Sequence, residues 1–306
     1  MNKWWPLAII LCLAGAVFVM FGVPKVQNRN TTPLPHKPIR IVSLAPNLTE
    51  ILFALGLEEQ IVAVSNDSDY PLEAAEKKKI GTFWQPSTEA IIACKPDLVV
   101  TLWFEQQKAV ANSLERLGYQ ILTLKIETIG ELLTAIQEIG IFTKCQSQAV
   151  QLLNELTGEL NDMQLRLGSA KKVKVLWIVQ AEPLRVAGRN TFINELIELA
   201  GGENAIGDTL QQYPPIGTEE ILACGAEVII QSAMGTGNMA EQQKAAEVFW
   251  SRWENLPAVK KNRIHVVEPD TVTRLGPRLY QGVELIARCL HPDIFEQGKN
   301  AAQQTR

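Results

Sequence analysis

The chain contains one motif twice, and this repeat limits its fold more than any other feature. Residues 87–101 and 217–231 share five identities and the same apolar pattern. Each copy predicts a short helix capped by Thr and then a buried strand of aliphatic residues. Two copies 130 residues apart predict two similar α/β lobes with a cleft between them.

The remainder of the chain continues this alternation of strands and helices. In the first half, Asn47 and Glu50 form the pattern of a capping box, which opens a helix that ends at Gly56. Further strands are predicted at 39–45, 61–65, 98–101, 120–124, 173–179, 228–231 and 264–267, and further helices at 87–94, before 118, at 192–199 and at 280–290. The predicted fold class is therefore α/β: two Rossmann-like lobes with mainly parallel sheets.

A long helix is predicted between the lobes, at about 146–167, because apolar residues recur there at spacings of three and four. A coiled-coil partner would produce the same stripe, but the flanking positions lack paired charges, which favours a backbone helix joining the lobes. Lobes joined by one rigid helix should flex little on ligand binding.

These patterns divide the chain into consecutive parts. The predicted parts are a membrane anchor or signal peptide at 1–23, a spacer at 24–38, a first α/β lobe at 39–144, a connecting helix at 145–168, a second α/β lobe at 169–292 and a polar tail at 293–306.

The N-terminus carries a membrane signal. Lys3 precedes twenty uncharged residues, 4–23, which is enough for a helix to cross a bilayer core of about 30 Å. The end of this segment offers a poor cleavage site, so an uncleaved anchor is favoured slightly over a removed signal peptide. The prolines of residues 24–38 then predict an extended spacer. The folded body is expected in the periplasm or at the outer face of the cytoplasmic membrane.

Composition and motifs argue against several classes of function. Three of the 29 basic residues and none of the 33 acidic ones lie in the first thirty positions, so the rest carries a net charge of −7. This balance argues against nucleic-acid binding. The five cysteines and three histidines are too scattered to predict a metal site. No nucleophile elbow or phosphate-binding glycine loop indicates an enzyme, although the fold class alone does not exclude one.

Several segments carry a family resemblance, at 38–56, 64–71, 81–84, 95–100, 186–190, 200–204 and 274–278. Over about residues 38–291 the chain resembles the class III, helical-backbone substrate-binding proteins of ABC importers for iron complexes and cobalamin. The resemblance implies a receptor, not an enzyme, that carries cobalamin or a related corrinoid as its transported ligand and needs no cofactor of its own. It implies a permease dimer with its ATPase as partners, and a monomer when free.

Glu89 and Glu219 occupy equivalent positions in the two repeats. By resemblance they match the glutamates that dock each lobe onto permease arginines, and one acid per lobe suits a two-fold partner. The alternative is that each acid only complements the dipole of its helix. The repetition in both lobes favours docking.

The predicted ligand contacts lie on loops that follow strands or precede the repeat helices. By resemblance the aromatic contacts are Tyr70, Trp84, Trp103 and Tyr213, and the polar contacts are Asp270 and Arg274. Aromatic side chains of this kind suit a large ligand with flat or apolar faces, such as a corrin, a haem or an aromatic siderophore.

Departures from the family pattern leave alternatives open. Tyr213 replaces a Trp, and Ala200 replaces the cysteine that would pair with Cys289, so the resemblance implies a free thiol there. A haem receptor would use an axial Tyr, and a siderophore receptor would use several arginines, such as Arg185, Arg189 and Arg274. A membrane-tethered interaction module without a transported ligand, or an uncharacterised α/β enzyme, also stays open.

Overall fold

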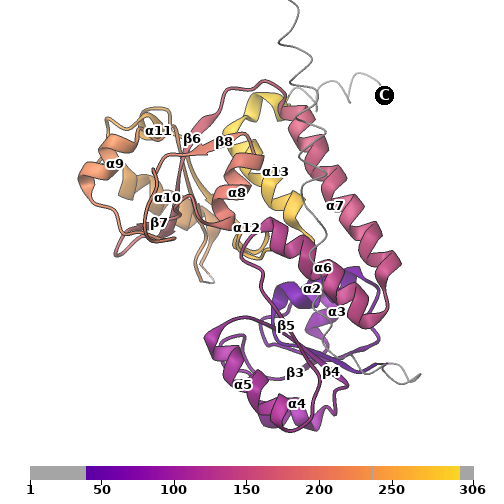
Figure 1. Ribbon diagram of the computed structural model, residues 1–306. Helices are drawn as coiled ribbons and strands as arrows, with labels where there is room; N and C mark the ends of the chain where they lie inside the picture. The colour runs from indigo at the N-terminus through magenta and orange to yellow at the C-terminus, as the bar shows by residue number, and fades with distance from the viewer. Residues whose placement is uncertain (1–38, 236, 297–306) are drawn as a thin grey trace, which may run out of the picture. The chain divides into compact units, whose positions relative to one another are not determined.

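The computed structural model describes residues 39–235 and 237–296, and Figure 1 shows the order of its elements. Its strands form two sheets, each with five strands. We call the sheet β1–β5 with helices α2–α5 the first lobe, and the sheet β6–β10 with helices α8–α13 the second lobe. Helices α6 and α7 lie between them in the sequence. This arrangement confirms the predicted α/β fold.

The first sheet is parallel throughout and has the order β3-β2-β1-β4-β5. Its strands are β1 (Ile41–Ser43), β2 (Ile61–Val64), β3 (Lys78–Lys79), β4 (Leu98–Leu102) and β5 (Ile121–Leu124). The helices of this lobe are α2 (Pro46–Ala54), α3 (Leu72–Ala75), α4 (Thr88–Ala93) and α5 (Glu105–Arg116). Helices therefore alternate with the parallel strands, as the crossover connections of such a sheet require.

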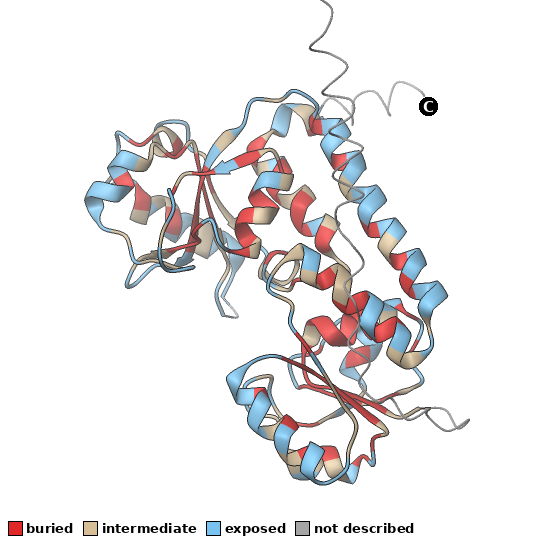
Figure 2. Ribbon diagram, viewed as in Figure 1, coloured by how far each residue is buried: buried red, intermediate tan, exposed pale blue. Residues whose placement is uncertain are grey.

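Both faces of the first sheet are covered, because successive side chains of a strand point to opposite faces. In β1, Val42 packs in a cluster with residues of α4 and α5, whereas Ile41 packs in a second cluster with residues of α2 and α6. Figure 2 shows the resulting pattern, in which the strands are buried and the outer sides of α4 and α5 are exposed.

The second sheet has the order β10-β9-β6-β7, and β8 also pairs with β6. Its strands are β6 (Val173–Gln180), β7 (Arg185–Val186), β8 (Gly202–Asn204), β9 (Val228–Ser232) and β10 (Ile264–Val267). Only the short β7 runs antiparallel among the described pairings, so the sheet is mainly parallel, as expected. Its helices are α8 (Phe192–Leu199), α9 (Thr218–Cys224), α10 (Met239–Trp250), α11 (Pro257–Lys260), α12 (Pro269–Thr273) and α13 (Leu279–Leu290).

The connecting helix α7 has the bounds Gln146–Leu167, which confirms the predicted long helix. It follows α6 (Ile129–Thr143) after a turn at Lys144, whose φ of 63° is left-handed. The apolar stripe of α7 packs within this chain, because Leu156 and Met163 belong to a core cluster that contains residues of both sheets. This burial favours the backbone helix over the coiled-coil alternative.

The structure corrects the predicted caps of the repeat helices. Thr88 and Thr218 are the first residues of α4 and α9, and neither is the cap. In α4 the cap is Ser87, whose Oγ accepts a hydrogen bond from the backbone N of Ala90. In α9 the cap is Gly217, whose backbone N donates to the Oε2 of Glu220. The two copies therefore start their helices by different chemistry, although the helix and strand predicted for each copy are confirmed.

The capping box predicted at Asn47 and Glu50 is wrong. Helix α2 begins at Pro46, which fixes a helical φ and needs no hydrogen-bond partner for its nitrogen. Asn47 instead donates from its Nδ2 to the carbonyl of Leu275, and Glu50 pairs with Arg278. Both side chains therefore contact the second lobe, 228 residues along the chain.

The predicted N-terminal membrane segment (1–23), the whole predicted spacer (24–38) and residues 297–306 of the predicted tail lie outside the described part of the chain. In the ranges 39–235 and 237–296, no helix has both the length and the hydropathy that a membrane crossing requires.

Candidate functional site

A buried ion pair connects the first lobe to the second. Glu50 on α2 accepts two hydrogen bonds from Arg278, from Nε at 2.9 Å and from Nη2 at 2.6 Å. The side chain of Glu50 is 4% exposed and that of Arg278 is 11% exposed. Burial raises the pKa of Glu50, and the hydrogen bonds and charge of Arg278 oppose this shift. The two parallel hydrogen bonds are those of a carboxylate held by a guanidinium, so we describe the pair as ionised at neutral pH.

A second arginine of the same segment also reaches the first lobe. Arg274 donates from Nη1 to the Oδ1 of Asp69 at 2.5 Å, and its Nη2 lies 3.2 Å from a carboxylate oxygen of Asp270. The hydrogen bond from Arg274 lowers the pKa of Asp69. The structure thus places the two predicted polar contacts, Asp270 and Arg274, side by side, and shows that each is already engaged with the other.

Tyr70 lies beside these charges. The guanidinium carbon of Arg278 stands 4.1 Å from the centre of the Tyr70 ring, which is the distance of a cation–π contact. The ring is nevertheless 43% exposed. Tyr70 precedes a cis proline, Pro71, in the loop after β2. The predicted contact Tyr70 is therefore joined to the charged residues of the second lobe.

Trp84 belongs to a separate aromatic cluster in the first lobe. Its ring packs edge-on against Phe83 at 4.8 Å and against Phe104 at 6.3 Å, measured between ring centres. Phe83 and Phe104 also contact each other at 5.4 Å. Trp84 stays 58% exposed and Phe104 is 37% exposed, so the cluster offers apolar surface to solvent. We call Phe83, Trp84 and Phe104 the aromatic platform.

Phe83 and Phe104 were not among the predicted site residues. Each stands next to a predicted aromatic contact in the chain, Phe83 beside Trp84 and Phe104 beside Trp103, and this adjacency was the signal available. Trp103 is exposed, and the Nζ of Lys108 lies 5.7 Å from its ring centre.

A buried glutamine fixes the loops that carry the platform. Gln107 on α5 is fully buried, and its Nε2 donates to the carbonyls of Leu44 and Phe83. Its Oε1 accepts from the Oγ1 of Thr101 and the backbone N of Leu102. One side chain therefore ties together the ends of β1 and β4 and the loop of the platform, so that the aromatic rings are held by a rigid support.

Tyr213 lies apart from the other aromatic contacts. It is half-buried in the loop before α9, where its carbonyl accepts a hydrogen bond from the Nη1 of Arg185. Burial raises the pKa of its phenol, and the charge of Glu127 adds to that shift. In the part of the chain that the structure covers, no ring contact joins Tyr213 to the first-lobe aromatics.

The two predicted docking glutamates are exposed and lie in the first turns of α4 and α9. Glu89 accepts a hydrogen bond from the Oγ of Ser87, the cap of its own helix. Among the described residues neither glutamate forms an ion pair. Both carboxylates are free to bind a cation of another molecule, as docking requires.

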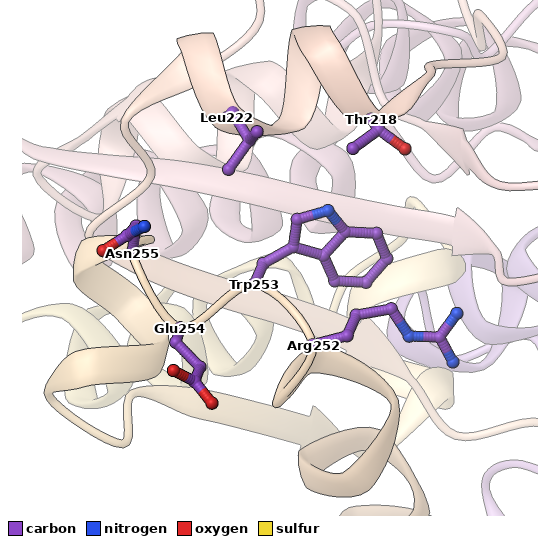
Figure 3. A pocket seen from close by; sticks show the side chains of 6 residues that line it. All are labelled: Thr218, Leu222, Arg252, Trp253, Glu254 and Asn255. Atoms are coloured by element: carbon purple, nitrogen blue, oxygen red, sulfur yellow. The ribbon is translucent and has the colours of Figure 1, made fainter.

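A hollow of about 480 Å³ lies beside α9, and Figure 3 shows the side chains around it. Its lining residues are Thr218, Leu222, Arg252, Trp253, Glu254 and Asn255. None of them is a predicted ligand contact. The Trp253 ring among them is half-buried and packs against the core of the second lobe, and we do not assign the ligand to this hollow.

Within residues 39–235 and 237–296, no three His, Cys, Asp or Glu side chains are grouped as a metal site. The four described cysteines, Cys94, Cys145, Cys224 and Cys289, are free thiols. Burial raises the pKa of Cys289 to about 11, so its thiol is protonated at neutral pH.

Comparisons with known proteins place the chain in a family. The model of a family described as periplasmic binding protein matches residues 41–271. An ABC transporter substrate-binding lipoprotein of Bacillus subtilis, YvrC, is 30% identical over 89% of this chain and 85% of its own length. The vitamin B12-binding protein of Vibrio parahaemolyticus is 28% identical over 84% of this chain and 91% of its own length.

Solved structures agree with this placement. The vitamin B12-binding protein BtuF of Vibrio cholerae superposes with a TM-score of 0.70 and 26% identity, over 82% of this chain and 96% of that one. The haem-binding protein HutB of Vibrio cholerae gives a TM-score of 0.73 at 23% identity, over 83% of this chain and 99% of that one, and this likeness concerns the fold alone.

Proposed function

The chain belongs to the periplasmic binding protein family and is a substrate-binding protein of an ABC transporter, and we propose that its transported ligand is cobalamin or a related corrinoid. The proposal includes an extracytoplasmic location, with the N-terminal segment 4–23 as anchor or signal, and delivery of the ligand to a membrane permease.

The main observation in favour of a corrinoid ligand is the aromatic platform. Three aromatic rings in mutual contact, one of them more than half exposed, are a costly surface for a protein to leave in water unless a ligand covers it. Trp103 and Tyr70 extend the exposed aromatic surface of the same lobe. A corrin ring system has apolar faces of matching size and a rim of amides, which suits rings on one lobe and polar side chains on the other.

Delivery is assigned to Glu89 and Glu219. Each lobe presents one exposed glutamate at the start of its repeat helix, and an ABC permease with two-fold symmetry would offer the same cation to each. Charge-assisted pairs of this kind fix the orientation of a receptor on its partner.

A haem or a ferric siderophore is the second candidate ligand, because haem-binding proteins share the fold. Tyr70 or Tyr213 would then be an axial ligand of haem iron. The stack of Arg278 on the Tyr70 ring and the half-buried position of Tyr213 argue for the corrinoid instead.

The decisive experiment is titration of the full chain with cyanocobalamin, haemin and ferric enterobactin, followed by calorimetry and tryptophan fluorescence. Saturable one-to-one binding of cyanocobalamin, weakened by Trp84→Ala, supports the proposal. Binding of haemin or the siderophore alone would replace the ligand and keep the transport role. Binding of none would favour a tethered module, and conversion of a ligand to product would favour an enzyme.

A further inference from the structure

Five charged side chains meet at the junction of the two lobes, next to Tyr70. They are Glu50 and Asp69 of the first lobe and Asp270, Arg274 and Arg278 of the second, and we call them the ion cluster. Three carboxylates face two guanidinium groups, so the ion cluster carries one net negative charge.

Both arginines are already paired with carboxylates. Arg278 gives two of its donors to Glu50, and its guanidinium carbon lies over the Tyr70 ring. Arg274 is held from one side by Asp69 and from the other by Asp270. If either arginine turned to an anionic ligand, it would leave a carboxylate of the protein without its partner. The free energy lost in this way offsets the gain from the new contact.

The charged groups around the ion cluster do not add a cationic side chain without a partner among those described here. Asp67 and Glu268 accept hydrogen bonds from backbone nitrogens close to the ion cluster. Lys79 donates its Nζ to the carbonyls of Ser68 and Ala74. On the Tyr213 side, Arg185 donates to the carbonyl of Tyr213, and the carboxylate of Glu127 is near enough to act on that phenol.

We propose that the ion cluster makes this receptor select neutral or cationic metal chelates and reject anionic ones, with Asp69 and Asp270 as the specificity-determining residues that occupy Arg274. The inference rests on the proposed function and deepens it. Cyanocobalamin is neutral overall, whereas haem carries two propionates and ferric catecholates carry several negative charges. A carboxylate presented to the ion cluster would meet a like charge, which is an effective means of rejecting a wrong ligand.

The test compares ligands that differ in charge and hardly in shape. One pair is cyanocobalamin and its monocarboxylic acid, in which one peripheral propionamide is hydrolysed, and the other is haemin dimethyl ester and haemin. Whichever of the two ligand pairs binds, we expect its more anionic form to bind at least about tenfold more weakly to the full chain at low salt. The difference should shrink as salt screens the charges.

Asp69→Asn combined with Asp270→Asn releases Arg274 and should abolish most of that difference between the two forms. Glu73→Gln is the matched control, because Glu73 is an exposed acid of the neighbouring helix α3 and should leave the difference intact. Salt dependence measured on the unaltered chain keeps the test valid if the double variant does not fold.

Equal affinity for the two forms in the unaltered chain, or a difference that survives in a folded double variant, would overturn the charge selection and leave the proposed transport function standing. Failure of both scaffolds to bind would overturn the proposed ligand class, and the charge selection with it.

Discussion

The two lobes share a repeat and a mainly parallel sheet, yet they place their aromatic residues differently. In the first lobe Trp84 and Trp103 lie on loops and are 58% and 62% exposed. In the second lobe Trp250 is fully buried, and Trp253 packs on it at 5.0 Å between ring centres under the guanidinium of Arg252. The first lobe therefore leaves aromatic surface exposed, whereas the second lobe packs these tryptophans against each other.

What the second lobe contributes at the junction is charge. Asp270, Arg274 and Arg278 come from α12 and the segment that follows it, and all three engage or adjoin carboxylates of the first lobe. Two similar α/β lobes of one chain can therefore differ in surface chemistry, with exposed aromatic rings on one and junction charges on the other.

The largest effect is expected from breaking the pair that joins the halves. Glu50→Ala leaves Arg278 buried without its partner, and the loss of unfolding free energy should be about 3–5 kcal/mol in a urea titration. Lys171→Ala is the control, because Lys171 is an exposed partner of Glu227 and its loss should cost about 0–1 kcal/mol. Equal losses in the two variants would show that the junction does not depend on this pair.

The next largest effect tests the division of aromatic roles. Trp84→Ala should weaken binding of cyanocobalamin by about 2 kcal/mol, or roughly thirtyfold, because a partly exposed ring loses its ligand contact and little of its packing. Trp253→Ala should lower thermal stability and leave the affinity unchanged. A reversed result, with affinity lost only in the Trp253 variant, would move the ligand to the second lobe.

A smaller effect is expected from the two glutamates that occupy equivalent positions in the lobes. Glu89→Ala and Glu219→Ala should each weaken association with the permease by about 1.5 kcal/mol, by loss of one charge-assisted contact, without altering ligand affinity. The measurement is co-purification with the permease complex in nanodiscs.

Matched controls separate docking from the helix dipole. Glu105→Ala and Glu241→Ala also remove an exposed acid from a helix first turn, one in each lobe, so they lose the same dipole interaction. Weakened association in these two variants as well would count against specific docking by Glu89 and Glu219.

The smallest effect is the pH dependence of stability that Asp69, an exposed member of the ion cluster, contributes. The pKa of Asp69 is lowered by Arg274, so its stabilisation is present above the ordinary carboxyl pKa of about 4 and disappears as the pH falls through the lowered value. Because the side chain is 57% exposed, we expect less than about 1 kcal/mol.

The check is the difference in unfolding free energy between the unaltered chain and Asp69→Asn. It should be present at neutral pH and decline as the pH is lowered below about 4. A difference that persists unchanged into strong acid would show that Asp69 acts through packing and not through its charge.

The sequence by itself determined the longer strands, the long helix α7 and the repeat, because apolar periodicity is a local signal of burial. Helix α8 has the predicted bounds, and α13 begins one residue earlier than predicted. Short elements such as β3 and β7 were not predicted, since two residues carry no period that could reveal them.

Only the tertiary structure decided what the polar side chains do. Asn47 and Glu50 have the spacing of a local cap, yet both contact residues of the second lobe. Arg274 was predicted to contact the ligand, and the structure shows it already held by Asp69 and Asp270. A hydrogen bond depends on which donor the fold brings within about 3 Å, and partners more than 200 residues apart leave no pattern in the sequence. The apolar pattern of the sequence therefore specifies the two lobes. The contacts between polar side chains are decided only when the folded lobes pack against each other.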